Sequence, residues 1–517
     1  MLLTNLLDHS KEKYGEYPFL YFENKSYSNH EVETIAKKIS ILLRNHGIHD
    51  GERVLVSIPN CPEVIFSYQG ILRSRSIVIP VMFLLHPSEV YYILNDSKAK
   101  AIITSAQYLP NMIEAAQNLS FQPKFIVVDQ LPNKEKYKDY EIIELYEAIS
   151  SLRVEQEMLE VASENDIAVI LYTSGTTGKP KGVMLTHKNL FSNAKVAYDL
   201  AVERGDLNKR TTIGILPLAH VYGFSSMNSS MLLGSSVVIF SKFDVDKIFQ
   251  CIEEYKVKNF SVVPAMIHAM VSSPNTKKYN LSSLESVVSG SAPLPVTLIK
   301  AFNEKFNARI FEGYGLSEAA PAVSSHREGM KVKPGSVGIP LPNIKVRIVD
   351  IHDNDVEQGH IGELIVKGDS ISPGYYGLEE ETRKAIKDGW LYTGDLVKMD
   401  EDGYLFIVDR KNDMIIRGGF NIYPRDVEEI ISSHEAVSEV AVIGIADERI
   451  GEEIIACVIK KPNTQVSEEE IILFSQQKLA KYKTPKRVVF LEQLPRSGVG
   501  KILKRKLKEQ YLTIDIQ

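Results

Sequence analysis

A loop rich in hydroxyl and amino groups follows the apolar run Ile167–Tyr172, which has the pattern of a buried strand. The segment that contains it, residues 171–183, has the sequence LYTSGTTGKPKGV. Glycines let backbone N–H groups close around an anion, hydroxyls add neutral donors, and lysines add positive charge. We therefore predict a polyphosphate site with contacts from Thr173, Ser174, Gly175, Thr176, Thr177, Gly178 and Lys181.

The spacing of this loop differs from that of the Walker phosphate loop. Two residues, not four, separate Gly175 from Gly178, and Pro180 stands where Ser or Thr would hold Mg²⁺. A plain Gly/Thr surface turn is the alternative interpretation. The density of donors directly after a buried strand favours the phosphate site.

Two further glycine-containing segments, residues 289–294 and 312–318, are candidates for the two sides of a nucleotide pocket. Glycine lets a flat ring lie against the backbone, and an aromatic face can stack on it. Ser317 can donate to a phosphate, and Glu318 is a hard oxygen ligand that suits Mg²⁺. The residues that we assign to nucleotide binding here are Gly290, Ser291, Glu312, Gly313 and Tyr314.

Three polar residues stand in segments that admit a functional or a structural role. His220 is the one histidine in an apolar stretch, and a satisfied core histidine is its structural alternative. Asp395 ends the sequence WLYTGD, and its carboxylate could accept both hydroxyls of a ribose. Arg410 follows Asp409, and the structural alternative for these two is a surface ion pair of small energy.

Two glycine-containing segments near the C-terminus complete the set of candidates. Gly419 lies in the sequence RGGFNIYP, where a thin ligand could pass against the backbone or the chain could simply turn. Lys501 ends the loop PRSGVGK and precedes a basic helix. Because a run of charges is usually a solvated face, we expect one to be formed by Lys504, Arg505, Lys506 and Lys508.

The elements that must position these residues alternate between amphipathic helices and apolar strands. The spacing predicts helices over Asn29–His46 and Glu63–Arg73, with a strand at Arg53–Ile58 between them. This βαβ rhythm predicts an α/β fold, in which residues 1–408 form a large N-terminal domain of layered subdomains with mostly parallel sheets. A small β-rich region starts near Gly362, and the charged segment Lys134–Glu160 is expected to be a surface connection.

The pattern of residues 413–517 predicts a small, mobile α+β domain. A hinge at residues 409–412 would join it to the N-terminal domain. Its expected helices cover Pro424–His434 and Ser467–Ala480. Its expected strands are Val437–Ile445, Ile454–Lys460 and Arg487–Leu491.

Composition limits the class of protein. The 517 residues require at least two domains, and a net charge of −6 argues against nucleic-acid binding. Three distant cysteines imply neither disulfides nor a zinc site. The N-terminus lacks the basic region of a signal peptide, and there is no apolar run long enough to span a membrane. We expect a cytoplasmic protein. The sequence leaves open whether the protein contacts a membrane peripherally and whether it forms a homodimer.

In their order and spacing, these motifs resemble those of the adenylate-forming superfamily, which includes acyl-CoA synthetases, adenylation domains and beetle luciferases. The resemblance covers nearly the whole chain and is nearest to bacterial medium- or long-chain fatty-acyl-CoA synthetases. It implies ATP, CoA and Mg²⁺ as cofactors and a fatty acid or another carboxylic acid as substrate. The acid would first be converted to acyl-AMP with release of pyrophosphate, and CoA would then displace AMP.

The resemblance also implies roles for single residues. His220 would lie beside the carboxylate substrate, Asp395 would bind the ribose, and Arg410 would contact the same nucleotide. Gly419 would line the tunnel for the pantetheine arm of CoA. Lys501 would bridge the carboxylate and the α-phosphate, and with Glu318, Ser317 and His220 it makes up the predicted catalytic group.

Two positions depart from the pattern of the family. Ser317 replaces the more frequent Thr and keeps the hydroxyl. Asn412 stands where the family usually has Asp or Lys at its hinge, and we expect it still to act as a pivot because Asn tolerates unusual φ values.

Three other functions share these motifs. An acyl-AMP ligase that loads a separate carrier protein would have the same adenylation residues. A nucleotide-binding regulator that has lost catalysis is less compatible with the retention of Lys501, Glu318 and Asp395. A luciferase-type oxygenase is a remote third interpretation.

Overall fold

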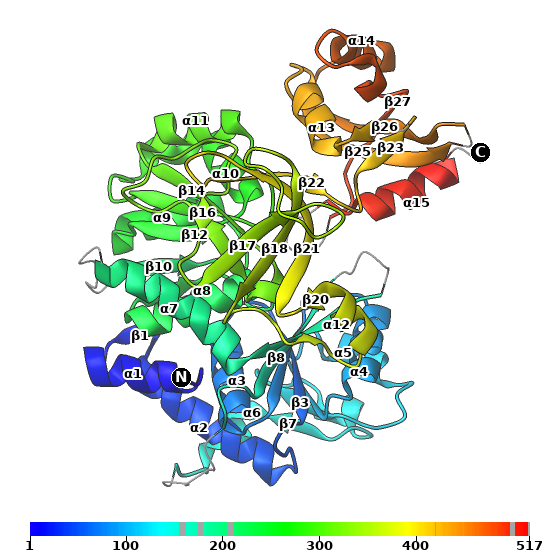
Figure 1. Ribbon diagram of the computed structural model, residues 1–517. Coiled ribbons are helices and arrows are strands. Elements are labelled where there is room, and N and C mark those ends of the chain that lie inside the picture. The colour runs from blue at the N-terminus through cyan, green and yellow to red at the C-terminus, as the bar shows by residue number, and fades with distance from the viewer. Residues whose placement is uncertain are drawn as a thin grey trace. The chain divides into compact units, whose positions relative to one another are not determined.

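The computed structural model describes residues 1–154, 162–173, 179–203, 210–418, 420–447, 449–496 and 502–514 (Figure 1). Residues 512–514 are described as backbone only. Its contacts divide the chain into two compact units. The first unit consists of Met1–Lys345 and Val366–Leu391, and the second unit of Val346–Ile365 and Tyr392–Gln517.

An eight-stranded sheet is the centre of the first unit, with the strand order β19-β9-β8-β4-β3-β5-β6-β7. The strands from β8 to β7 run parallel, whereas β9 and β19 are antiparallel to their neighbours. The bounds are β3 Arg53–Ser57, β4 Ile77–Pro80, β5 Ala101–Thr104, β6 Lys124–Val127, β7 Ile142–Glu144, β8 Ile167–Thr173, β9 Lys181–Thr186 and β19 Gly374–Tyr375.

Both faces of this sheet are buried, as a parallel sheet requires. Val54 and Val56 of β3 pack on one face with residues of helices α2 (Asn29–Asn45) and α3 (Pro62–Arg73). Leu55 points to the other face, where α4 and α5 cover the sheet (Figure 1). These two helices are α4 Pro87–Ser97 and α5 Leu109–Ala116. Successive side chains of a strand point to opposite faces, so an unbroken apolar run is the expected pattern.

The first unit contains two smaller sheets. A five-stranded sheet has the order β12-β13-β14-β15-β16, and β12 to β14 are parallel. Its bounds are β12 Asn259–Val262, β13 Ser286–Ser289, β14 Arg309–Gly315, β15 Ala322–Ser325 and β16 Ile339–Pro340. Three helices contribute to the core beside it, α9 Val245–Tyr255, α10 Pro264–Ser272 and α11 Val296–Phe306. A four-stranded sheet has the order β10-β11-β1-β2, with bounds β10 Thr211–Gly214, β11 Ser236–Ile239, β1 Pro18–Phe22 and β2 Lys25–Ser28.

The remaining helices of the first unit are α1 Asn5–Tyr14, α6 Leu145–Ser150, α7 His187–Glu203, α8 Val221–Leu233 and α12 Glu379–Ala385. A further sheet, with the order β17-β18-β21-β20 and β22 paired to β21, makes up the β-rich region. Its bounds are β17 Ile344–Val349, β18 Gly362–Gly368, β20 Ile386–Lys387, β21 Trp390–Met399 and β22 Leu405–Arg410.

The C-terminal part of the second unit is a five-stranded sheet with helices on both faces. Val442 and Ala456 pack with α13 and α14 on one face, and Ile443 and Cys457 pack with α15 on the other. The elements are β23 Ile415–Arg417, β24 Phe420–Ile422, α13 Pro424–Ser432, β25 Val437–Asp447, β26 Gly451–Lys460, α14 Glu468–Gln476, β27 Arg487–Phe490 and α15 Lys504–Ile514.

The predicted α/β fold with mostly parallel sheets is confirmed, and one local expectation is wrong. The segment Lys134–Glu160 is not only a surface connection, because its described part contains β7, the edge strand of the main sheet, and α6. Only two isoleucines, flanked by Glu141 and Glu144, mark this strand, so its apolar pattern is too short to stand out. The hinge at residues 409–412 stays a prediction.

The three cysteines are free, and two of them are buried. In the described part of the chain, no helix is both long and apolar enough to cross a membrane.

Candidate active site

The predicted phosphate loop connects two antiparallel strands of the main sheet. Thr173 ends β8 and pairs with Lys181, which begins β9. Residues 168–171 of β8 are buried, so the strand that leads into the loop is fixed by the core. The predicted contacts of Ser174, Gly175, Thr176, Thr177 and Gly178 lie outside the described residues and stay predictions.

The two predicted sides of the nucleotide pocket follow neighbouring parallel strands. Ser289 at the end of β13 is paired with Glu312 of β14, so Gly290 and Gly313 lie at the same edge of the sheet. A side chain at Gly290 would come within 3.3 Å of the Tyr222 ring. This edge can therefore present backbone to a flat ligand only where glycine is kept.

Backbone conformation at this edge is also unusual. Ser291 has a φ of +71°, in the left-handed region that non-glycine residues seldom occupy. A side chain at Gly315 would lie 2.2 Å from the carbonyl oxygen of Pro321, so only glycine fits there. Glu312 is buried, and Tyr314 is half-buried on β14. The structure thus brings together Gly290, Ser291, Glu312, Gly313 and Tyr314, and their role in nucleotide binding stays a prediction.

Glu318 lies in a short 3₁₀ helix, Ser317–Ala319, directly after this edge. The hydroxyl of Tyr375 donates to Glu318 Oε1 at 2.9 Å. The backbone N–H of Ser372 donates to the carbonyl oxygen of Glu318 at 2.8 Å. Lys181 Nζ lies 5.3 Å from the centroid of the Tyr375 ring, in the geometry of a cation–π contact. Tyr375 therefore joins the predicted metal ligand to a predicted phosphate contact.

Sequence reasoning missed Tyr375. The sequence SPGYYG has the composition of a turn, and nothing in it indicates a partner more than fifty residues away. A signal does exist in the two adjacent tyrosines, because large aromatic side chains in a turn usually need a packing partner.

His220 caps the N-terminus of α8. Its Nδ1 accepts a hydrogen bond from the backbone N–H of Tyr222 at 3.3 Å, so the proton of the neutral ring is on Nε2. Burial lowers the pKa of His220 to about 4, and the ring is therefore neutral at physiological pH. A neutral imidazole with its proton on Nε2 can donate a hydrogen bond to a carboxylate.

Asp395 and Arg410 lie opposite each other on β21 and β22 of the second unit. Arg410 Nε is 3.1 Å from Asp395 Oδ1, and the Asp395 side chain is only 4% exposed. Asp409 accepts a hydrogen bond from the backbone N–H of Arg410 at 2.7 Å. Asp409 also accepts from the backbone N–H of Arg425 at 3.0 Å, at the first turn of α13, and burial raises the pKa of Asp409.

The C-terminal basic run is not a uniformly solvated face, contrary to expectation. Lys504 Nζ is 2.8 Å from Glu428 Oε1, and its side chain is only 17% exposed. Burial opposes its charge, but Glu428 and Asp409 attract the ammonium group and raise the pKa of Lys504 overall. Arg505 and Lys506 are exposed as expected. This ion pair therefore connects the first turn of α15 to α13.

Gly419 and Lys501 lie outside the described residues, so their roles stay predictions. The base of the loop that carries Lys501 is described. Arg496 forms an antiparallel bridge with Ile502, and the N–H of Leu503 donates to the carbonyl oxygen of Pro495 at 2.8 Å.

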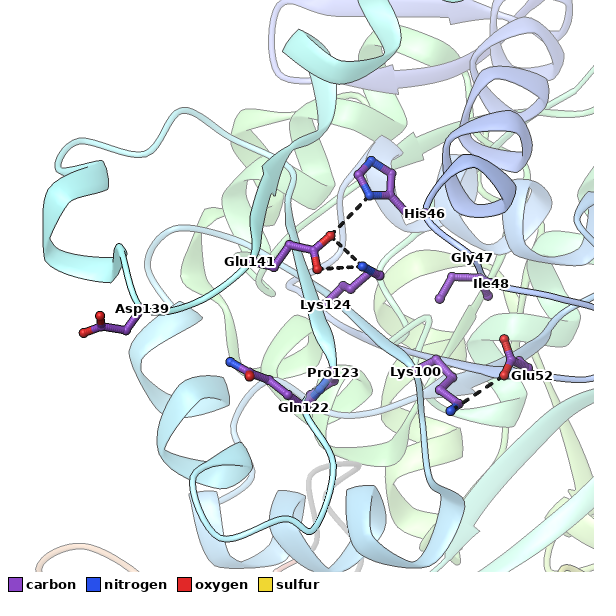
Figure 2. A pocket seen from close by; sticks show the side chains of 10 residues that line it. All are labelled: His46, Gly47, Ile48, Glu52, Lys100, Gln122, Pro123, Lys124, Asp139 and Glu141. Carbon is purple, nitrogen blue, oxygen red and sulfur yellow. Dashed lines mark hydrogen bonds and ion pairs between the residues drawn. The ribbon is translucent and has the colours of Figure 1, made fainter.

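A charged pocket of about 360 Å³ lies at the amino ends of β5, β6 and β7 (Figure 2). Lys124 bonds to both oxygens of Glu141 at 2.6 Å, and Lys100 is 3.9 Å from Glu52. Open α/β sheets bind ligands at the carboxyl ends of their parallel strands, which is the opposite edge. This pocket contains none of the predicted site residues and is not the candidate active site.

Residues 7–376 match the family of AMP-binding enzymes, and residues 426–501 match the C-terminal domain of these enzymes. The chain belongs to the AMP-binding enzyme family, which confirms its assignment to the adenylate-forming superfamily.

Relatives of known activity cover almost the whole chain. The protein is 36% identical to the long-chain-fatty-acid–CoA ligase of Bacillus subtilis (strain 168), over 98% of this chain and 94% of that one. It is 34% identical to 4-coumarate–CoA ligase 1 of Petroselinum crispum, over 95% of this chain and 90% of that one. The solved structure of ATP-bound MatB from Rhodopseudomonas palustris superposes with a TM-score of 0.89 at 28% identity, covering 99% and 100% of the two chains. These findings identify an AMP-forming acid–CoA ligase, for which ATP and CoA are substrates.

The residues present fit a magnesium ion. In the part of the chain that the structure describes, no cluster of three or more metal-ligating side chains exists. Mg²⁺ is usually held by one or two carboxylates together with substrate phosphates, so a cage is not needed. Among the described contacts, the Glu318 carboxylate accepts a hydrogen bond through Oε1 only, which leaves Oε2 for a cation.

Proposed function

We propose that this ligase activates a medium- or long-chain fatty acid. The observation that carries the proposal is the 36% identity to a long-chain-fatty-acid–CoA ligase over 98% of the chain. The similar identity to a 4-coumarate–CoA ligase makes an aromatic acid the second candidate.

The reaction has two steps. A carboxylate oxygen attacks the α-phosphorus of ATP, the bond to the β-phosphate oxygen breaks, and pyrophosphate leaves. The thiolate of CoA then attacks the carbonyl carbon of acyl-AMP, and AMP leaves with the oxygen that the acid supplied. AMP is a far better leaving group than oxide, which is why the first step is needed.

In this proposal the first unit holds the phosphates and the acid. Thr173 and Lys181, with the rest of their loop, would bind the phosphates, and His220 would contact the carboxylate. Ser317 would donate to the α-phosphate, and Glu318 would hold Mg²⁺, which would offset the charge of the phosphates. The support for Glu318 is its carboxylate chemistry and its position beside the edge that carries Gly290 and Tyr314.

The second unit would supply the remaining groups. Asp395 would accept the two ribose hydroxyls, with Arg410 beside it. Lys501 would offset charge as the carboxylate approaches the α-phosphate, which is electrostatic stabilisation of the transition state. Gly419 would let the pantetheine arm pass.

A panel of acids tests the substrate proposal. The rate of pyrophosphate release would be measured with saturated acids from C6 to C18 and with 4-coumarate, each in the presence of CoA. We expect the highest kcat/KM between C8 and C18 and a much lower value for 4-coumarate. A preference for 4-coumarate would overturn the fatty-acid proposal.

The same assay separates the remaining alternatives. Pyrophosphate release with acylation of a phosphopantetheinylated carrier protein, but not of free CoA, would indicate a carrier-loading ligase. No release with any acid would indicate a nucleotide-binding regulator.

A further inference from the structure

Residues 372–376 connect the two parts of the candidate site that must act on the same triphosphate. Tyr375 pairs with Val183 as β19 joins β9, and the N–H of Tyr376 donates to the carbonyl oxygen of Gly182 at 2.8 Å. Ser372 Oγ donates to the carbonyl oxygen of Met184 at 2.7 Å. The same segment therefore borders β9, the strand that Lys181 begins.

This segment also fixes Glu318 at two points. The Ser372 N–H bonds to its carbonyl oxygen and the Tyr375 hydroxyl bonds to its carboxylate, at 2.8 and 2.9 Å. A phenol is protonated at neutral pH, so the Tyr375 hydroxyl is the donor and the Glu318 carboxylate the acceptor of this bond. A glutamate side chain has three rotatable bonds, and a contact at its carboxylate removes much of that freedom.

We infer that Tyr375 is a positioning residue for adenylation, holding the Glu318 carboxylate toward a divalent cation while its ring supports the ammonium group of Lys181. The inference rests on the proposed role of Glu318 in holding Mg²⁺. Tyr375 does not need to touch the substrate for this role. Its two contacts couple the position of the cation to that of a phosphate-binding lysine.

The chain offers a matched control in Tyr376. Tyr376 directly follows β19 and packs against the apolar cluster that includes residues of α4 and α5, whereas Tyr375 packs against the cluster on the opposite face of the sheet. Tyr376→Phe thus removes a phenol hydroxyl one residue away from the proposed contact.

The test measures the affinity for Mn²⁺ by electron paramagnetic resonance, in the presence of the unreactive analogue α,β-methylene-ATP. A hydrogen bond to a charged group supports an effect of about ten-fold, so we expect Tyr375→Phe to weaken Mn²⁺ binding by roughly that factor. Tyr376→Phe should leave it unchanged. Glu318→Gln should weaken it as well, and adding Tyr375→Phe to Glu318→Gln should cause no further loss, because Tyr375 acts on the cation only through the carboxylate that Glu318→Gln removes.

A second variant tests the contact with Lys181. Tyr375→Phe keeps the ring and should preserve the affinity for the analogue without metal. Tyr375→Leu should weaken that affinity by about two- to five-fold, the scale of a partly exposed cation–π contact.

Unchanged Mn²⁺ affinity in Tyr375→Phe, with weakened binding in Glu318→Gln, would overturn the inference. Unchanged affinity in Glu318→Gln would remove the metal role of Glu318 and the inference with it. Acyl-CoA formation by the wild-type enzyme, measured separately, shows whether the proposed fatty-acid activity has failed as well.

Discussion

Arg410 Nε and Asp395 Oδ1 lie 3.1 Å apart across two antiparallel strands, and the carboxylate is almost fully buried while the Arg410 side chain is 40% exposed. The arginine thus holds a buried carboxylate in one orientation. A charged, fixed carboxylate is suited to accept two hydroxyls from one ribose.

Asp395→Asn keeps the shape of the side chain but removes its charge. We expect the KM for ATP to rise by about ten-fold, since hydrogen bonds to a charged acceptor are stronger than neutral ones. We also expect the variant to discriminate less than the wild type between ATP and 2′-deoxyATP. Steady-state pyrophosphate release with both nucleotides measures this.

Arg410→Gln is the control for the ion pair alone, and its effect on KM should be smaller. If Asp395→Asn leaves the ratio between the two nucleotides unchanged, Asp395 does not bind the ribose.

The depressed pKa of His220 predicts a dependence of stability on pH. Its pKa of about 4 in the folded protein lies below the ordinary 6.5, so the unfolded chain binds the proton more readily. The contribution of neutral His220 to the free energy of unfolding is therefore complete above pH 6.5 and is lost as the pH falls toward 4.

His220→Phe removes this dependence and keeps an aromatic ring. The loss of the N-cap acceptor should cost about 1 kcal/mol at pH 7. Between pH 7 and pH 5, however, the free energy of unfolding should fall by about 1–2 kcal/mol less in the variant than in the wild type. Urea titrations at both pH values measure the free energy of unfolding of the two proteins. An equal fall between pH 7 and pH 5 in the variant and the wild type would show that His220 is not shielded from water.

Lys504 is expected to stabilise the second unit through Glu428. Lys504→Met should lower the free energy of unfolding by about 1–3 kcal/mol, less than for a fully buried pair because the lysine side chain keeps 17% exposure. Lys508 is the matched control, since its ammonium group is 3.8 Å from Glu452 and its side chain is 31% exposed. Thermal unfolding would contradict the assignment if Lys504→Met and Lys508→Met behaved alike.

Lys504 and Tyr375 show which features local sequence patterns cannot predict. Lys504 belongs to a basic run, and its burial depends on Glu428, which is distant in sequence. Tyr375 owes its importance to Glu318, also distant in sequence. Pairings of this kind arise from tertiary packing, and a single sequence contains no periodic signal for them.

The long strands and the glycine positions could be predicted because their signal is local in the sequence. The long apolar run of β8 indicates a buried strand by itself, and the glycines of the 312–315 segment indicate a close backbone approach wherever they fold. At Gly315 the close neighbour is the chain itself, because an added side chain would lie 2.2 Å from the carbonyl oxygen of Pro321. The apolar run of β7 is two residues long, which is below the length at which the pattern is informative.

Lys501 and Gly419 are far apart in the sequence of the predicted mobile domain, so we expect each to serve one half-reaction. Lys501→Ala should slow adenylation by on the order of 10²–10³, the scale for one lost charge-stabilising donor. It should leave thioester formation from supplied acyl-adenylate largely intact. Gly419→Leu should do the reverse. Rapid-quench measurements of the two half-reactions test this, and damage to the same half-reaction by both substitutions would exclude two orientations.

The most direct test of the central claim follows the oxygen atoms of the acid. Palmitate labelled with ¹⁸O at both carboxylate oxygens would be incubated with the enzyme, ATP, Mg²⁺ and CoA, and the products would be analysed by mass spectrometry. The account predicts palmitoyl-CoA that retains one labelled oxygen, and AMP that carries the other. Palmitoyl-CoA formed without label in AMP, or label found in inorganic phosphate or pyrophosphate, would contradict an acyl-adenylate route.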